Sequence, residues 1–87
     1  MDRSKPIDIS LHASEKMGDR GASEEEVRAA VRTGNEEPAR KGRSRFRKSF
    51  CFNAQWRGRH YAVKQVAPVV AEERDRLVVV TVYTYYF

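Results

Sequence analysis

The residues of this chain that could take part in acid–base chemistry are mostly basic, and they gather between residues 40 and 64. That segment contains nine lysines and arginines and no acidic residue, whereas residues 1–39 contain six against nine Asp and Glu. Residues 65–87 contain two against three. Charges separated this sharply attract a polyanion or an acidic partner. Protection of a strand edge needs only one or two charges, so nine indicate an anion-binding surface.

Together with histidine and tyrosine, these cations form a set compatible with metal-free cleavage of RNA. The ribose 2′-hydroxyl is then the nucleophile, and the site needs a base near it, an acid near the leaving 5′-oxygen and cations around the phosphate. His12 is the predicted general base or acid, because its side chain titrates near neutrality. The predicted catalytic residues, which share a helix face or neighbouring strands, are His12, Lys16, Lys48 and Lys64.

Phosphate and base binding are assigned to an arginine stripe and to the following turn. The stripe occupies alternate positions opposite an apolar strand face, and the turn carries the one tryptophan, whose ring could stack on a base. The predicted nucleic-acid-binding residues are Arg43, Arg45, Arg47, Arg57, Arg59 and Trp56.

Several of these residues have a structural alternative. His12 could pack or cap near a helix start, and Lys48 could extend its amine from the edge of the core. Trp56 could cover the hairpin end, while Tyr83 and Tyr85 are strong strand formers and could also transfer protons. The lone cysteine, Cys51, excludes an internal disulfide and is predicted to be a core residue.

Two short helices are predicted to precede a sheet. Ser10 is a good N-cap for a helix over about residues 10–17, which Gly18 and Gly21 then end. Ser23 and Glu26 form a capping box for a second helix over about residues 23–33. Residues 35–42 read as a surface loop.

Three strands follow, over about residues 43–53, 59–71 and 77–87. In the first strand the even positions are mostly apolar, and in the second the odd positions are expected to face inward. Pro68 predicts a bulge or the end of regular pairing. The third strand is apolar on both faces, which favours a central position or a homodimer through this strand.

These observations predict one α+β domain spanning residues 1–87, with two helices followed by a three-stranded antiparallel sheet. The chain has no apolar run of transmembrane length and no secretion signal, so we expect a cytosolic protein without membrane contact. No motif for a cofactor or a metal is present, and none is expected.

Residues 10–27 resemble the opening of the domain-of-unknown-function 4258 family. That pattern has a His-Ala pair, a basic residue before Met, an Arg-Gly pair and a capped second helix; His12-Ala13, Lys16-Met17 and Arg20-Gly21 fill these places. Lys16 stands where arginine is expected, which keeps the charge but loses the planar fork. Gly58, residues 63–66 and residues 80–83 also fit, so the resemblance spans nearly the whole chain.

That family is similar to the RelE and BrnT type of small ribonuclease toxins. The resemblance implies a compact helix-plus-sheet fold, RNA cleavage and an antitoxin partner, but no toxin catalytic triad maps onto this chain. The resulting hypothesis is an RNA-binding, metal-independent endoribonuclease of toxin–antitoxin type. The alternative is a non-catalytic module that uses the same basic face to bind nucleic acid or a protein.

Overall fold

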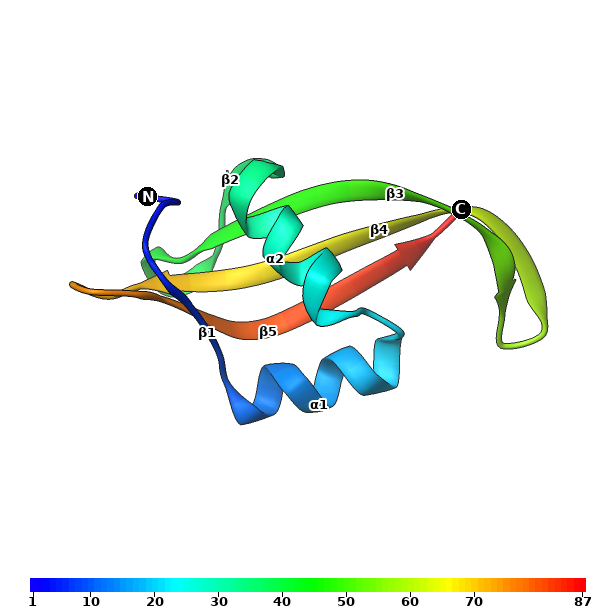
Figure 1. Ribbon diagram of the computed structural model, residues 1–87, viewed down its shortest axis with the longest axis horizontal. Coiled ribbons are helices and arrows are strands. Elements are labelled where there is room, and N and C mark those ends of the chain that lie inside the picture. The colour runs from blue at the N-terminus through cyan, green and yellow to red at the C-terminus, as the bar shows by residue number, and fades with distance from the viewer.

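The computed structural model describes residues 1–87 and contains two α-helices on one face of a five-stranded sheet (Figure 1). The helices are α1 (Leu11–Arg20) and α2 (Glu24–Thr33). The strands are β1 (Ile7–Ile9), β2 (Asn35–Pro38), β3 (Ser44–Trp56), β4 (Arg59–Glu72) and β5 (Leu77–Tyr86). Their order in the sheet is β1-β5-β4-β3-β2, with β1 parallel to β5 and all other neighbours antiparallel.

The prediction of a three-stranded antiparallel sheet is therefore wrong, because two short strands extend it. β1 has three residues and pairs in parallel with residues 77–79, far along the chain. β2 has the sequence Asn-Glu-Glu-Pro, which is poor in strand formers, and the prediction of a surface loop is therefore wrong for residues 35–38. Its place at the sheet edge tolerates Pro38, since a proline there removes no hydrogen bond within the sheet.

A tight turn joins β2 to β3 and carries three cations. Its two central residues, Lys41 and Gly42, have φ values of 61° and 71°, as in the hairpin turns whose twist matches that of the strands. Arg40 and Arg43 flank them, and the Arg43 N–H donates to the Arg40 carbonyl at 3.2 Å. The turn thus projects a basic tip from the sheet.

Local capping sets both helices. The Ser10 hydroxyl accepts from the Ala13 N–H, and Ser23 and Glu26 form the complete capping box that the sequence predicts. The first helix runs past its predicted end, because Gly18 continues the helix on its exposed side. Gly21, with φ of 75°, ends it in the left-handed conformation typical of helix C-termini.

The core lies between the helices and one face of the sheet. The helix α2 packs on β3 and β4, and α1 packs along β5 (Figure 1). One cluster joins apolar side chains of both helices to four strands: Ile7, Ala13, Met17, Ala22, Val27, Val31, Phe46, Val66, Val70, Leu77, Val79 and Val82. No helix covers the opposite face, which we call the open face of the sheet.

The strand β4 has the opposite phase to the one expected. Lys64 and Val66, at even positions, face the helices and are buried, whereas Gln65 and Ala67 belong to the open face. The predicted irregularity near Pro68 is confirmed as a shift of register between Val69 and Val70. β4 has apolar residues at both odd and even positions, so the sequence pattern alone does not determine which set faces the helices.

The β3–β4 hairpin bends over the end of α1 (Figure 1). A bulge between Cys51 and Ala54 causes the bend, and β3 continues through it to Trp56. The Trp56 ring stacks on Tyr86, with centroids 5.1 Å apart and planes 14° apart. Cys51 is exposed, so its predicted place in the core is wrong.

Arg3 fastens the N-terminal segment to the end of α2. Its guanidinium donates to the carbonyls of Val31, at 2.8 Å, and of Gly34. The same group lies 4.5 Å from the centre of the Phe46 ring. These bonds satisfy carbonyls that a helix end leaves unpaired, and they hold β1 in place beside β5.

A matched pair of glycine substitutions tests the packing of Trp56 and Tyr86 against the turn between the two helices. A Cβ at Gly21 would lie 2.6 Å from the Tyr86 hydroxyl and 2.7 Å from the Trp56 ring. Gly21→Ala should therefore lower the free energy of unfolding by about 2–4 kcal/mol, from overpacking and positive φ together. Gly18→Ala meets nothing within 4 Å and should instead raise it by about 0.5–1 kcal/mol. Urea melts measure both, and equal effects would contradict the packing of Trp56 on this turn.

Candidate nucleic-acid interface

The open face carries the arginine stripe that the sequence predicts. Phe46 is buried against the helices, so its neighbours Arg45 and Arg47 project to the other side of β3. There they meet two tyrosines of β5: Arg45 lies 5.9 Å from the centre of the Tyr83 ring, and Arg47 lies 5.2 Å from that of Tyr85. Each tyrosine is 37% exposed, so both rings remain available for stacking.

Arg20 joins this face from the end of α1, a contact that the sequence analysis missed. Its guanidinium lies 4.8 Å from the centre of the Tyr83 ring and donates to the Val82 carbonyl at 2.7 Å. Two guanidinium groups, those of Arg20 and Arg45, therefore lie near the Tyr83 ring. The signal was present in the sequence, since Arg20 follows His12 and Lys16 at intervals of four residues, along one row of the helix.

Glu37 is an acidic residue that pairs with the arginine stripe, and sequence analysis missed it as well. Its Oε1 accepts from Arg47 at 2.8 Å and from Arg45 at 3.0 Å. The hydrogen bonds from Arg47 and then Arg45 lower the pKa of Glu37, and the same contact raises the pKa of Arg47. This carboxylate orients the two guanidinium groups and occupies part of their donor capacity, as a phosphate could.

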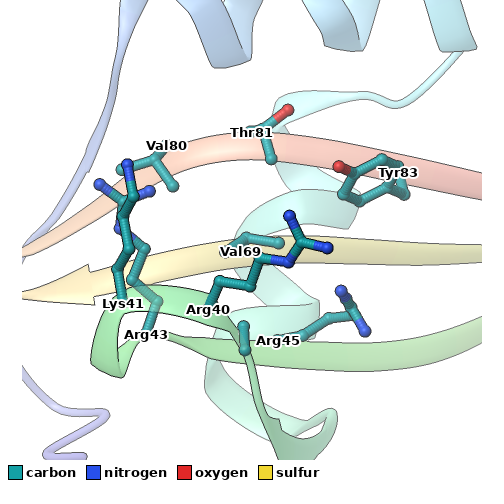
Figure 2. A pocket seen from close by; sticks show the side chains of 9 residues that line it. Arg40, Lys41, Arg43, Arg45, Val69, Val80, Thr81 and Tyr83 are labelled. Carbon is teal, nitrogen blue, oxygen red and sulfur yellow. The ribbon is translucent and has the colours of Figure 1, made fainter.

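Next to this pair lies a shallow pocket of about 560 Å³ between the β2–β3 turn and β5. Figure 2 shows Lys41 and Arg43 at one end of it and Tyr83 at the other, with its hydroxyl toward the pocket. None of the nine lining residues is acidic, and four are basic: Ala39, Arg40, Lys41, Arg43, Arg45, Val69, Val80, Thr81 and Tyr83. Arg40, Lys41 and Arg43 form no ion pair within the chain, so their charges are free to bind an anion.

Lys64, predicted to be catalytic, lies on the covered side of the sheet. Its Nζ is 2.9 Å from Glu26 Oε1 and 2.9 Å from the Gly21 carbonyl, and it is 5.1 Å from the centre of the Phe52 ring. The side chain joins the turn between the helices to the middle strand. It is separated from the arginine stripe by the thickness of the sheet.

The other predicted catalytic residues lie apart from one another. His12 is exposed and Lys16 half-buried on α1, and neither lines the pocket. Lys48 is half-buried on β3 and lines a separate hollow beside β2. The four residues are therefore not brought together in one cluster.

The predicted nucleic-acid-binding residues at the hairpin end lie beyond the arginine stripe. Arg57 lies 5.1 Å from the centre of the Trp56 ring and donates to the Asp19 carbonyl at 2.8 Å. Arg59 is exposed. Trp56 both covers the hairpin end, through its stack on Tyr86, and lines a hollow there, so its two predicted roles are compatible.

No group of three His, Cys, Asp or Glu side chains is placed to hold a metal ion. Neither helix is long and apolar enough to cross a membrane.

Comparison with known proteins identifies the family. A family model described as "Domain of unknown function (DUF4258)" matches residues 9–84. The chain belongs to this family. No curated protein and no solved structure matches the chain. The match includes α1, the arginine stripe and Tyr83, whereas Tyr85 lies one residue beyond its end.

The Glu26–Lys64 pair makes a testable contribution to acid stability. Burial alone would raise the pKa of Glu26, but hydrogen bonds from Lys64 and the Ser23 backbone outweigh it and lower the pKa below the ordinary 4.5. A carboxylate with a lowered pKa in the folded state stabilises the protein above its unfolded pKa, and this contribution is lost as the pH falls through the folded value. Below about pH 5, the melting temperature of Glu26→Gln should therefore fall less steeply with decreasing pH than that of the wild type.

Glu25→Gln is the matched control, because Glu25 is an exposed neighbour in the same first turn of α2. The melting temperature of Glu25→Gln should vary with pH as that of the wild type does. Identical profiles for Glu26→Gln and the wild type would show that the ion pair does not act in solution.

Proposed function

We propose that this protein binds single-stranded RNA on the open face of its sheet. The observation that carries the proposal is the pocket lined by Arg40, Lys41, Arg43 and Arg45 without an acidic residue. Guanidinium groups bind phosphate with two parallel hydrogen bonds, and a groove with several of them follows a phosphate backbone. No acidic residue of the chain lines this pocket, so the net charge of +5 understates its local field.

The tyrosines favour a single strand over a duplex. Tyr83 and Tyr85 present exposed rings beside guanidinium groups, and unpaired bases stack on such rings whatever their sequence. A duplex hides the faces of its bases and offers only phosphates to this surface. RNA as the ligand and a toxin-type activity are proposed from the similarity of the domain-of-unknown-function 4258 family, which residues 10–27 resemble, to small ribonuclease toxins.

Salt dependence tests the binding. If about four to six cations contact phosphates, the slope of log K against log salt should be roughly −3 to −4 for a single strand. Changing Arg43, Arg45 and Arg47 together to Gln should reduce its magnitude by about two units. Arg74→Gln removes an exposed charge from the β4–β5 turn and should leave the slope unchanged. A flat slope in the wild type would exclude this mode of binding.

A second candidate function, endoribonuclease activity, is favoured by the position of Tyr83. Its hydroxyl shares the pocket with four cations, and a tyrosine can act as a general acid or base. In this reaction a base takes the proton of the 2′-hydroxyl, whose oxygen bonds to phosphorus. The bond to the 5′-oxygen then breaks, an acid protonates that oxygen, and a cyclic phosphate remains. The cations would stabilise the charge that develops on the phosphate.

His12 is the other acid–base candidate, and its exposure makes the test clean. His12→Ala should leave the melting temperature and RNA affinity nearly unchanged, because the side chain is not buried in the core. If it transfers a proton, single-turnover cleavage should fall by about 10²–10⁴-fold. Tyr83→Phe is measured in parallel, with RNA alone and with ribosomes, to decide between the two residues. A wild type that never cuts RNA leaves the binding module as the function.

A toxin of this type is held inactive by an antitoxin, and we propose that such a partner is acidic and covers the open face. Glu37 already places a carboxylate between two arginines there, which shows how an acidic side chain can bind them. The predicted homodimer through β5 stays a prediction. β1 pairs with residues 77–79 of β5, and Arg20 of α1 donates to the Val82 carbonyl, so parts of this strand's outer edge are already occupied.

A further inference from the structure

A second hollow, of about 280 Å³, lies where the β3–β4 hairpin bends over the end of α1. Its lining combines aromatic rings, two arginines and one carboxylate residue: Asp19, Arg20, Trp56, Arg57, Tyr83, Thr84 and Tyr86. Tyr83 also lines the cationic pocket, at the end opposite Lys41 and Arg43 (Figure 2). The two cavities are therefore neighbours that share one tyrosine.

The walls of this hollow are held rigidly. The Tyr86 hydroxyl and the Thr84 hydroxyl both donate to the Arg20 carbonyl, at 2.7 and 2.8 Å. Tyr86 in turn stacks on Trp56 with nearly parallel planes. Burial also raises the pKa of Tyr86. A preformed wall of this kind loses little conformational entropy when a flat ligand binds.

The groups around the hollow match the needs of a flat heteroaromatic ring. Trp56 and Tyr83 offer aromatic rings, and the guanidinium carbons of Arg57 and Arg20 lie 5.1 and 4.8 Å from the centres of those two rings. Arg57 uses one nitrogen to bind the Asp19 carbonyl, so further N–H groups remain for the edge of a ring. The volume is below the roughly 300–1,000 Å³ of cavities that enclose a whole drug-sized ligand.

We infer that this hollow is a subsite for one unpaired nucleobase, next to the cationic pocket that receives a phosphate of the same strand. The inference rests on the proposed RNA binding and deepens it, because it separates a phosphate subsite from a base subsite. Tyr83, between them, contacts both parts of one nucleotide. The strand then crosses the open face from the β2–β3 turn toward the end of α1.

Trp56 makes the inference directly measurable, because it is the only tryptophan of the chain. The intact protein is titrated with a short oligoadenylate and with an abasic ribose–phosphate oligomer of the same length. Both should bind, but only the oligoadenylate should quench tryptophan fluorescence, since only it carries a ring that stacks at this subsite. Binding of both without a change in fluorescence overturns the base subsite and leaves the proposed RNA binding intact. Binding of neither overturns both.

Two variants sharpen the result. Trp56→Ala should weaken oligoadenylate binding about 5- to 150-fold, the loss expected for one stacked base, and leave the abasic oligomer unaffected. Trp56→Phe keeps a ring and should bind oligoadenylate more tightly than Trp56→Ala does. Equal losses for the two oligomers in a variant that still melts cooperatively would overturn the inference. If Trp56→Ala fails to fold, the fluorescence titration of the wild type decides.

Discussion

Lys64 ties the turn between the helices to the middle of the sheet, and the arrangement of the whole molecule depends on this contact. Its ammonium bonds both to the Gly21 carbonyl and to Glu26, whose carboxylate also completes the capping box of α2. A buried charge is tolerated only when it is paired and hydrogen-bonded, so this lysine requires the turn to lie over β4. Both helices consequently cover one face of the sheet, and the arginine stripe is left on the other.

The open face exists because the chain has too few helical residues to cover both sides of the sheet. Two helices of ten residues each can bury only one side of a sheet whose longest strand has fourteen. The exposed side therefore carries polar and charged groups, with Tyr83 and Tyr85 packed among guanidinium groups. Electrostatic repulsion among these cations is offset within the chain by Glu37, and an anionic ligand would relieve it further.

The two parts of the interface that we propose come from two different hairpins of the chain. The β2–β3 turn supplies cations at one end, and the bent β3–β4 hairpin supplies Trp56 and Arg57 at the other. The bulge after Cys51 is needed for this arrangement, because a straight hairpin would carry Trp56 away from Tyr86. Gly21 has a corresponding role, since no larger residue fits beneath the two rings.

The sequence by itself determined the features that depend on neighbouring residues. Capping by Ser10 and Ser23, the period of two that opposes Arg45 and Arg47 to Phe46, and the irregularity after Pro68 all arise from contacts within a few residues or from strand geometry. Tertiary structure alone decided the rest. β1 has only three residues and exists because distant β5 offers it hydrogen bonds, and β2 exists because β3 pairs with it across a tight turn, although Asn-Glu-Glu-Pro carries almost no strand signal. The phase of β4 depended on a partner for Lys64, and a charged residue in a strand reads as exposed until that partner is known.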